Sequence, residues 1–101
     1  MVIQRTVNGV NAHLKVSGVV GNANASEFSN TLADLTQRGC EQIVLDLSDV
    51  PMICSAAIDS MILFFHCQKR QGREVVIEGI HQSLKDLFVT LRLDEAFGLE
   101  A

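Results

Sequence analysis

The sequence lacks several features that indicate common classes of function. It contains no tryptophan or tyrosine and only five phenylalanines, so it has no row of aromatic side chains on which single-stranded nucleic acid stacks. Its eight basic residues are outnumbered by twelve acidic residues and form no continuous Lys/Arg stripe, and its formal charge is −4. A surface that neutralises phosphates is not expected, so nucleic acid is not predicted to be a direct partner.

Cysteine is also scarce. Cys40, Cys54 and Cys67 are odd in number, and they show neither a CxxC spacing nor the Cys/His spacing of a zinc site. We expect reduced thiols in a cytoplasmic protein, because disulfides are rare in that compartment. No metal and no other cofactor is predicted.

No apolar run is long enough to cross a membrane. The apolar run over residues 62–65 is far shorter than the roughly 20 residues that a spanning helix needs. The N-terminus becomes polar at Gln4 and Arg5, which is too early for a signal peptide. We therefore expect no direct insertion into a membrane.

The chain does contain enough apolar material for one core. Apolar residues make up 48% of its 101 residues, with one proline and no compositionally simple stretch. A single ordered domain over residues 1–101 is predicted. The elements expected from periodicity are strands over 3–7 and 10–18, a helix over 24–38, a strand over 43–47, a helix over 56–70, a strand over 75–77, a helix over 84–91 and a helical turn over 94–97.

The order of these elements predicts the fold class. Asn8 and Gly9 separate the first two strands and favour a tight hairpin, because this dipeptide tolerates positive φ. The later strands are joined by helices that are long enough for parallel crossovers. The fold is therefore expected to be α/β, with a mixed sheet of four to five strands, an N-terminal hairpin and three to four helices.

Polar residues and glycine mark the expected ends of the helices. Asn24 and Glu27 have the spacing of a capping pair, and Gly39 stands where a C-terminal cap is expected. Ser55 is predicted to cap the helix over residues 56–70.

The helix over residues 56–70 is predicted to have an apolar side and a polar side. At 100° per residue, one broad side contains Ala57, Ile58, Met61, Ile62, Phe64 and Phe65. On the outward side, Leu63 is the only large apolar residue among Ala56, Asp59, Ser60, His66, Cys67 and Arg70. Such a stripe is either an ordinary solvated helix exterior or a docking surface.

Motifs for catalysis are missing. The sequence contains no GxGxxG, GxxxxGK[ST], GxSxG or HExxH. His13, His66 and His81 are scattered, and adjacent helical residues such as His66 and Cys67 point about 100° apart instead of forming a catalytic pair. We expect a non-enzymatic protein.

One segment carries a recognisable motif, residues 45–58, which read LDLSDVPMICSAAI. It resembles the signature of the STAS domain, the anti-sigma-factor antagonist family, in which a strand L-D-L-S-x-V is followed by a loop and by D-S-S-G-L at the start of a helix. Gly18 with residues 23–28 is similar to the family's exit from its second strand. RLDEAF, at 92–97, is similar to its C-terminal G-L-D-x-x-F. The resemblance implies the STAS fold.

The resemblance also implies protein partners and a phosphorylation site. In the family, a serine kinase of the histidine-kinase-like ATPase fold phosphorylates the second serine of D-S-S-G, and a PP2C-type, metal-dependent serine phosphatase removes the phosphate. The motif's four positions are occupied here by Cys54, Ser55, Ala56 and Ala57, so the acceptor hydroxyl is missing at Ala56. Three explanations stay open: a natural non-phosphorylatable member, a shift of the target to Ser55, or a deliberate Ser→Ala substitution.

Two functions are consistent with this resemblance. The first is a partner-switching regulator of transcription or biofilm formation, comparable to the family's single-domain biofilm regulators. It would bind its kinase, an anti-sigma-type partner or an unknown downstream target, and phosphorylation would release it. The second is an accessory subunit of an ABC-type phospholipid transport complex. In both, the predicted partner-binding residues are Ser55, Ala56, Asp59, Ser60 and Leu63.

Overall fold

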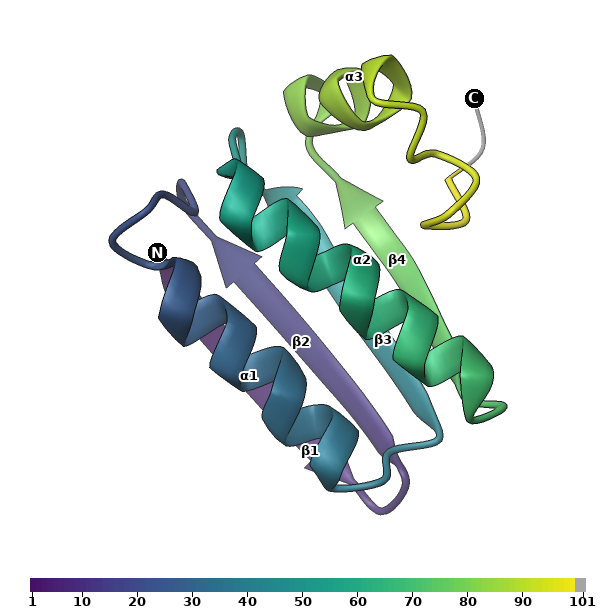
Figure 1. Cartoon of the computed structure of the whole chain (residues 1–101). Helices are drawn as coiled ribbons and strands as arrows, with labels where there is room; N and C mark the ends of the chain where they lie inside the picture. Colours follow the sequence, from purple (N-terminus) through teal and green to yellow (C-terminus); the bar gives the residue numbers. More distant parts are fainter. Residues whose placement is uncertain (100–101) are drawn as a thin grey trace.

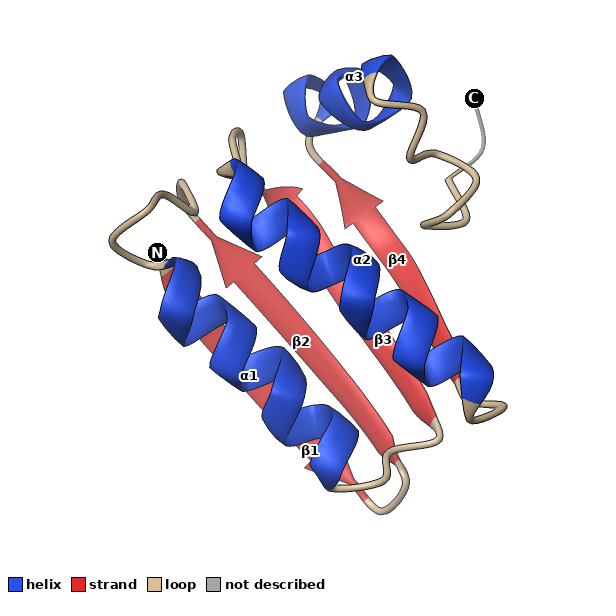
Figure 2. Cartoon of the chain, in the orientation of Figure 1, coloured by secondary structure: helices blue, strands red, loops and turns tan. Residues whose placement is uncertain are grey.

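The computed structural model describes residues 1–99 and shows an α/β fold of four strands and three helices within that range (Figures 1 and 2). The predicted order of elements and the fold class are confirmed. The elements are β1 (Val2–Asn8), β2 (Asn11–Ser17), α1 (Ala25–Gln37), β3 (Gln42–Asp49), α2 (Ser55–Arg70), β4 (Glu74–Ile80) and α3 (Gln82–Thr90). The helical turn expected over residues 94–97 is present as a single hydrogen-bonded turn, in which the Phe97 N–H donates to the Leu93 carbonyl (3.0 Å), and it does not extend into a helix.

The four strands form one mixed sheet in the order β1-β2-β3-β4. β1 and β2 make the predicted hairpin, but Asn8 is still paired with Asn11, so the loop consists of Gly9 and Val10, with Gly9 at φ +65°. β2, β3 and β4 run parallel. The two crossover helices, α1 and α2, lie side by side on the same face of the sheet, and α3 lies beyond the end of β4 (Figure 1). Within residues 1–99, no helix covers the opposite face.

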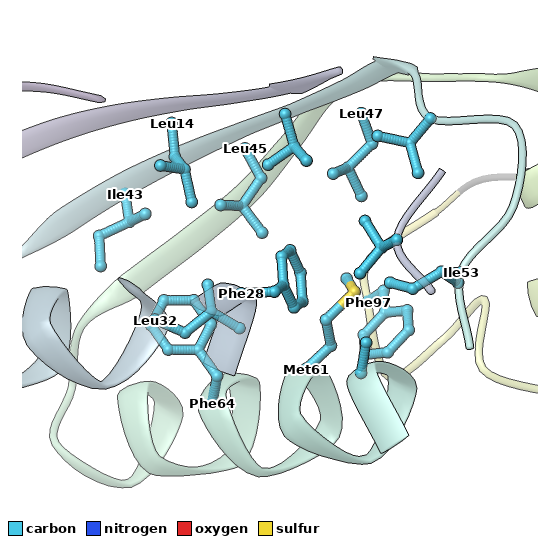
Figure 3. Packing of buried hydrophobic residues seen from close by; sticks show 14 of the residues in the cluster. Leu14, Phe28, Leu32, Ile43, Leu45, Leu47, Ile53, Met61, Phe64 and Phe97 are labelled. Carbon is cyan, nitrogen blue, oxygen red and sulfur yellow. The ribbon is translucent and has the colours of Figure 1, made fainter. Parts of the chain in front are cut away.

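The core lies between the sheet and these two helices (Figure 3). Alternate residues of β2 and β3 point toward the helices, as the period of an extended strand requires. The apolar stripes of α1 and α2 pack against them, and Phe97 closes one end of the core. The labelled side chains in this cluster are Leu14, Phe28, Leu32, Ile43, Leu45, Leu47, Ile53, Met61, Phe64 and Phe97.

The predicted helix caps are only partly right. Gly39 follows the last turn of α1 at φ +72°, as predicted. Asn24 precedes α1, but its side chain does not cap the helix and instead accepts a weak hydrogen bond from the Gly21 N–H (3.4 Å). Cys54, not Ser55, is the N-cap of α2. The Cys54 N–H donates to the Val20 carbonyl (2.8 Å), which holds Cys54 in an extended conformation and makes Ser55 the first helical residue.

Gln68 is a polar residue in the core that the sequence pattern did not single out. It lies on the buried side of α2 and is 0% exposed. Among residues 1–99, neither the nitrogen nor the oxygen of its side-chain amide has a hydrogen-bond partner. Burying an amide without partners costs free energy, so Gln68 reduces the stability of this fold.

Replacing Gln68 with leucine is therefore expected to raise the free energy of unfolding by about 1–2 kcal/mol, because an unpaired buried amide is exchanged for an apolar group of similar volume. Urea denaturation measures the change. Gln71→Leu is the matched control, since Gln71 is exposed, and it should change stability by less than about 0.5 kcal/mol. A loss of stability in Gln68→Leu would show that the amide has a favourable partner.

Candidate partner-binding site at the start of helix α2

The start of α2 is held in place by the loop that follows β2. The Val20 N–H donates to the Met52 carbonyl (3.0 Å), and the Cys54 N–H donates to the Val20 carbonyl (2.8 Å). Val20 and Ile53 form a short parallel bridge, and both side chains are buried. The loops at the carboxyl ends of β2 and β3 are thus tied together, which fixes the N-terminus of α2 relative to the sheet.

The aspartate and serine of the L-D-L-S motif shape the end of β3. The Asp46 carboxylate accepts hydrogen bonds from the hydroxyl (2.6 Å) and the backbone N–H (3.0 Å) of Ser48. These two hydrogen bonds lower the pKa of Asp46 below its ordinary value, because they stabilise the ionised form. Gly79 of β4 lies against them: a Cβ at Gly79 would be 3.1 Å from the Asp46 Oδ1 atom. The motif therefore has a structural role, and Gly79, which sequence reasoning missed, makes room for it.

The predicted partner-binding residues come together on the outward side of α2. Ser55, Ala56 and Asp59 are exposed, Ser60 is half-buried, and Leu63 is 63% exposed. Because residues three and four apart are neighbours on a helix, they form a continuous surface from the first turn to the middle of α2. Their predicted positions are confirmed, whereas their role in binding remains a prediction.

Three exposed apolar residues near this surface were not predicted. Met52 and Val19 are each more than half exposed and flank the buried bridge between Val20 and Ile53. Each directly precedes a buried residue, Ile53 or Val20, and in an extended segment successive side chains point to opposite sides. This alternation was the signal in the sequence that could have identified Met52 and Val19 as exposed. The inward position predicted for Ile62 is wrong, because the buried side of α2 is centred on residues such as Met61 and leaves Ile62 at its margin, 38% exposed. Leu63 is therefore not the only large apolar side chain exposed on α2.

A groove runs between α1 and α2 beside Leu63. Its volume is about 260 Å³, and it is open to solvent, so it suits a protruding side chain of another protein better than an enclosed small molecule. No residue that lines it in the described part of the chain is charged. The lining residues are Ser29, Leu32, Ala33, Thr36, Gln37, Ser60, Leu63, Phe64 and Cys67.

The first turn of α2 favours negative charge. The first backbone N–H groups of a helix have no partner within the helix, and the helix dipole is positive at this end. Ala56 is the second residue of α2, and its exposed methyl group carries no hydroxyl. Ser55 carries the only hydroxyl among residues 55–58, the first turn. A phosphate on this turn would require either Ser55 or a serine at position 56.

The histidines do not form a catalytic group in the described structure. His13 pairs with Glu78 on the uncovered face of the sheet (3.0 Å), and the His81 side chain caps α3 by accepting from the Ser83 N–H (3.1 Å). His66 is exposed on α2. Within residues 1–99, no group of three or more His, Cys, Asp or Glu side chains is arranged to hold a metal ion. None of the helices in that range has the length and apolar character that a membrane span requires.

The chain is similar to known proteins over almost its whole length. An anti-sigma factor antagonist from Mycobacterium paratuberculosis matches with a TM-score of 0.82 and 16% identity, over 97% of this chain and 83% of that one. The anti-sigma factor antagonist SpoIIAA in its unphosphorylated form matches with a TM-score of 0.74 and 7% identity, over 99% of this chain and 100% of that one. The phosphorylated form of the Bacillus cell fate determinant SpoIIAA matches with a TM-score of 0.74 and 8% identity, over 93% and 86% of the two chains.

These solved structures share the fold, and the sequence itself identifies the family. The family described as "Mlab, STAS domain" matches residues 3–100. This match includes the LDLSDV strand, the start of α2 and the C-terminal RLDEAF segment that carried the resemblance. The chain belongs to the STAS domain family.

Proposed function

We propose that this STAS domain is a non-enzymatic, cytoplasmic regulator that binds a partner protein through the outward side of α2. The charge at position 56 decides whether the partner binds. The observation that carries this proposal is the exposed position of Ala56, the second residue of α2, where the family motif has its phosphoacceptor serine. The proposed binding residues are Ser55, Ala56, Asp59, Ser60 and Leu63.

The physical basis of the switch is a change in the surface and not in the fold. A phosphate adds roughly −1.5 to −2 charges and three acceptor oxygens. At the second residue of a helix this charge is compatible with folding, because it lies near free N–H groups and the positive end of the dipole. A partner surface fitted to a methyl group at position 56 would collide with the phosphate and would have to desolvate it.

With alanine at position 56, no phosphate can add negative charge at that position. The chain is therefore proposed to be constitutively competent to bind. By the family resemblance, its partners are a serine kinase of the histidine-kinase-like ATPase fold, a PP2C-type phosphatase and a downstream target. Two backbone hydrogen bonds support this proposal, one from the Val20 N–H to the Met52 carbonyl and one from the Cys54 N–H to the Val20 carbonyl, because a rigid junction presents the same surface in the free and bound states.

The test restores the acceptor. Ala56→Ser, incubated with the cognate serine kinase and ATP, is expected to gain one phosphate by intact-mass spectrometry, and the unaltered chain is expected to gain none. The double variant Ser55→Ala/Ala56→Ser should still gain one phosphate. Transfer to the unaltered chain would identify Ser55 as the acceptor instead, and no transfer to Ala56→Ser would contradict the proposed switch.

A second candidate is a permanent accessory subunit of an ABC-type phospholipid transport complex. The missing hydroxyl at Ala56 favours it, because a contact that is never released needs no acceptor, and so does the uncharged groove between α1 and α2. Co-expression with the transporter's ATPase subunit distinguishes the two. A complex of fixed stoichiometry that survives incubation with a serine kinase and ATP, even when Ala56 is replaced by serine, would support the subunit. A complex that dissociates would support the regulator.

A further inference from the structure

The outward stripe of α2 carries opposite charges toward its two ends. Asp59 lies in the second turn, and Arg70 is the last residue of the helix. Both side chains are exposed, and within residues 1–99 neither forms an ion pair. They are 11 residues apart, which corresponds to about 16 Å along the helix axis. These two charges are therefore available to a partner.

Between these two charges the stripe consists of Leu63 and His66 and carries no Asp, Glu, Lys or Arg side chain. Leu63 is 63% exposed at the edge of the groove between α1 and α2, and no residue in the described lining of that groove is charged. The exposed residues of α1 that line the groove, Ala33 and Gln37, are also uncharged. A fitting partner must offer an apolar side chain at its centre and opposite charges on either side.

A second copy of the chain meets these requirements. Asp59, Leu63, His66 and Arg70 follow one another at spacings of four, three and four residues, so they form one stripe along α2. This pattern of spacings is unchanged when the direction of the helix is reversed. In an antiparallel pair of α2 helices, each Asp59 therefore faces the Arg70 of the second copy, and each Leu63 faces the second copy's His66 beside the groove. In such a dimer, the two-fold symmetry axis between the copies generates both the Asp59–Arg70 contact and the Leu63–His66 contact twice.

We propose that the chain forms a symmetric dimer by antiparallel packing of α2 against α2 of a second copy. Two Asp59–Arg70 ion pairs flank the centre, where both Leu63 side chains become buried. If the proposed function is right, the dimer covers the partner-binding residues, so the second copy and the partner protein compete for one surface. The dimer itself rests only on the stripe and the groove, and the competition also rests on the proposed function.

The test measures self-association by sedimentation as a function of protein concentration. The mass of the unaltered chain is expected to rise from 11.0 kDa toward twice that value. At low salt, Asp59→Arg and Arg70→Asp should each weaken association by about tenfold, because like charges then face each other at two places. The double variant Asp59→Arg/Arg70→Asp should recover the original association, since both pairs are restored with their signs exchanged.

Lys69→Asp is the matched control. It makes the same change in net charge as Arg70→Asp at an exposed neighbouring residue outside the stripe, so it should leave association unchanged. Circular dichroism of each variant establishes that it is folded. A chain that remains monomeric up to about 1 mM would overturn the proposal. So would a dimer that neither charge reversal weakens, or a double variant that associates no better than the single ones. If the charge-reversal variants change self-association as expected but the unaltered chain binds neither the kinase nor the ATPase subunit, only the proposed function is refuted.

Discussion

Ala56→Glu is expected to weaken binding of the partner protein by about 100-fold while leaving the fold intact. The glutamate places a bulky carboxylate at a position that otherwise presents only a methyl group. Binding would have to desolvate that charge without a counter-charge fitted to it. Glutamate is a good helix former and is favoured near a helix N-terminus, so the variant should be at least as stable as the parent chain.

Calorimetric titration with the cognate kinase, or with the transporter's ATPase subunit, measures the change in affinity. The matched control is Gln4→Glu, which adds the same single charge on β1, on the face of the sheet opposite α1 and α2. It should alter the affinity by less than about twofold, because exposed charges distant from an interface act weakly at ordinary salt. Equal affinity of Ala56→Glu and the parent chain would place the partner on another surface.

Phe97→Ala is expected to lower the free energy of unfolding by about 3–5 kcal/mol. Phe97 is 2% exposed, and its ring centroid lies 4.8 Å from that of Phe65 on α2 and 4.9 Å from that of Phe88 on α3. Removing the ring leaves a cavity between the segment that follows α3 and the rest of the core. The expected loss is large beside the 5–15 kcal/mol that stabilises a typical domain.

Urea denaturation at neutral pH measures this loss. Val89→Ala is the control, because Val89 also lies near the C-terminal end of α3 but is 42% exposed, and it should cost less than about 1 kcal/mol. If Phe97→Ala were no more destabilising than Val89→Ala, the segment after α3 would not be part of the cooperative core. The C-terminal RLDEAF motif would then need another explanation than packing.

The effect of Ala56→Glu on affinity and the effect of Phe97→Ala on stability are expected to be separable. Position 56 lies on the surface at the start of α2, whereas Phe97 packs against Phe65 in the third turn of that helix. A variant at position 56 therefore changes the affinity without lowering the unfolding midpoint. A variant at position 97 changes the midpoint, and it lowers binding only under conditions in which a substantial fraction of the chain is unfolded.

Local patterns in the sequence predicted the surface of α2 well. Ser55, Ala56, Asp59, Ser60 and Leu63 all lie on its outward side because helical periodicity depends only on spacing along the chain. Periodicity predicts the margins of a buried stripe less well. Ile62 and Gln68 show this: the first is partly exposed although it is apolar, and the second is buried although it is polar. Which residues at the edge become covered depends on how the sheet and neighbouring helices meet α2.

The sequence by itself determined the order and type of the elements, the hairpin, the family and the position of the missing hydroxyl. These follow from the periods of strands and helices and from motif letters, which are properties of adjacent residues. Only the tertiary structure decided that α2 begins at Ser55, that Gly79 lies against Asp46, and that Met52 and Val19 are exposed beside the site. Each of these depends on contacts between segments far apart in the chain, such as the Cys54 N–H to Val20 hydrogen bond, and local periodicity contains no information about such pairings.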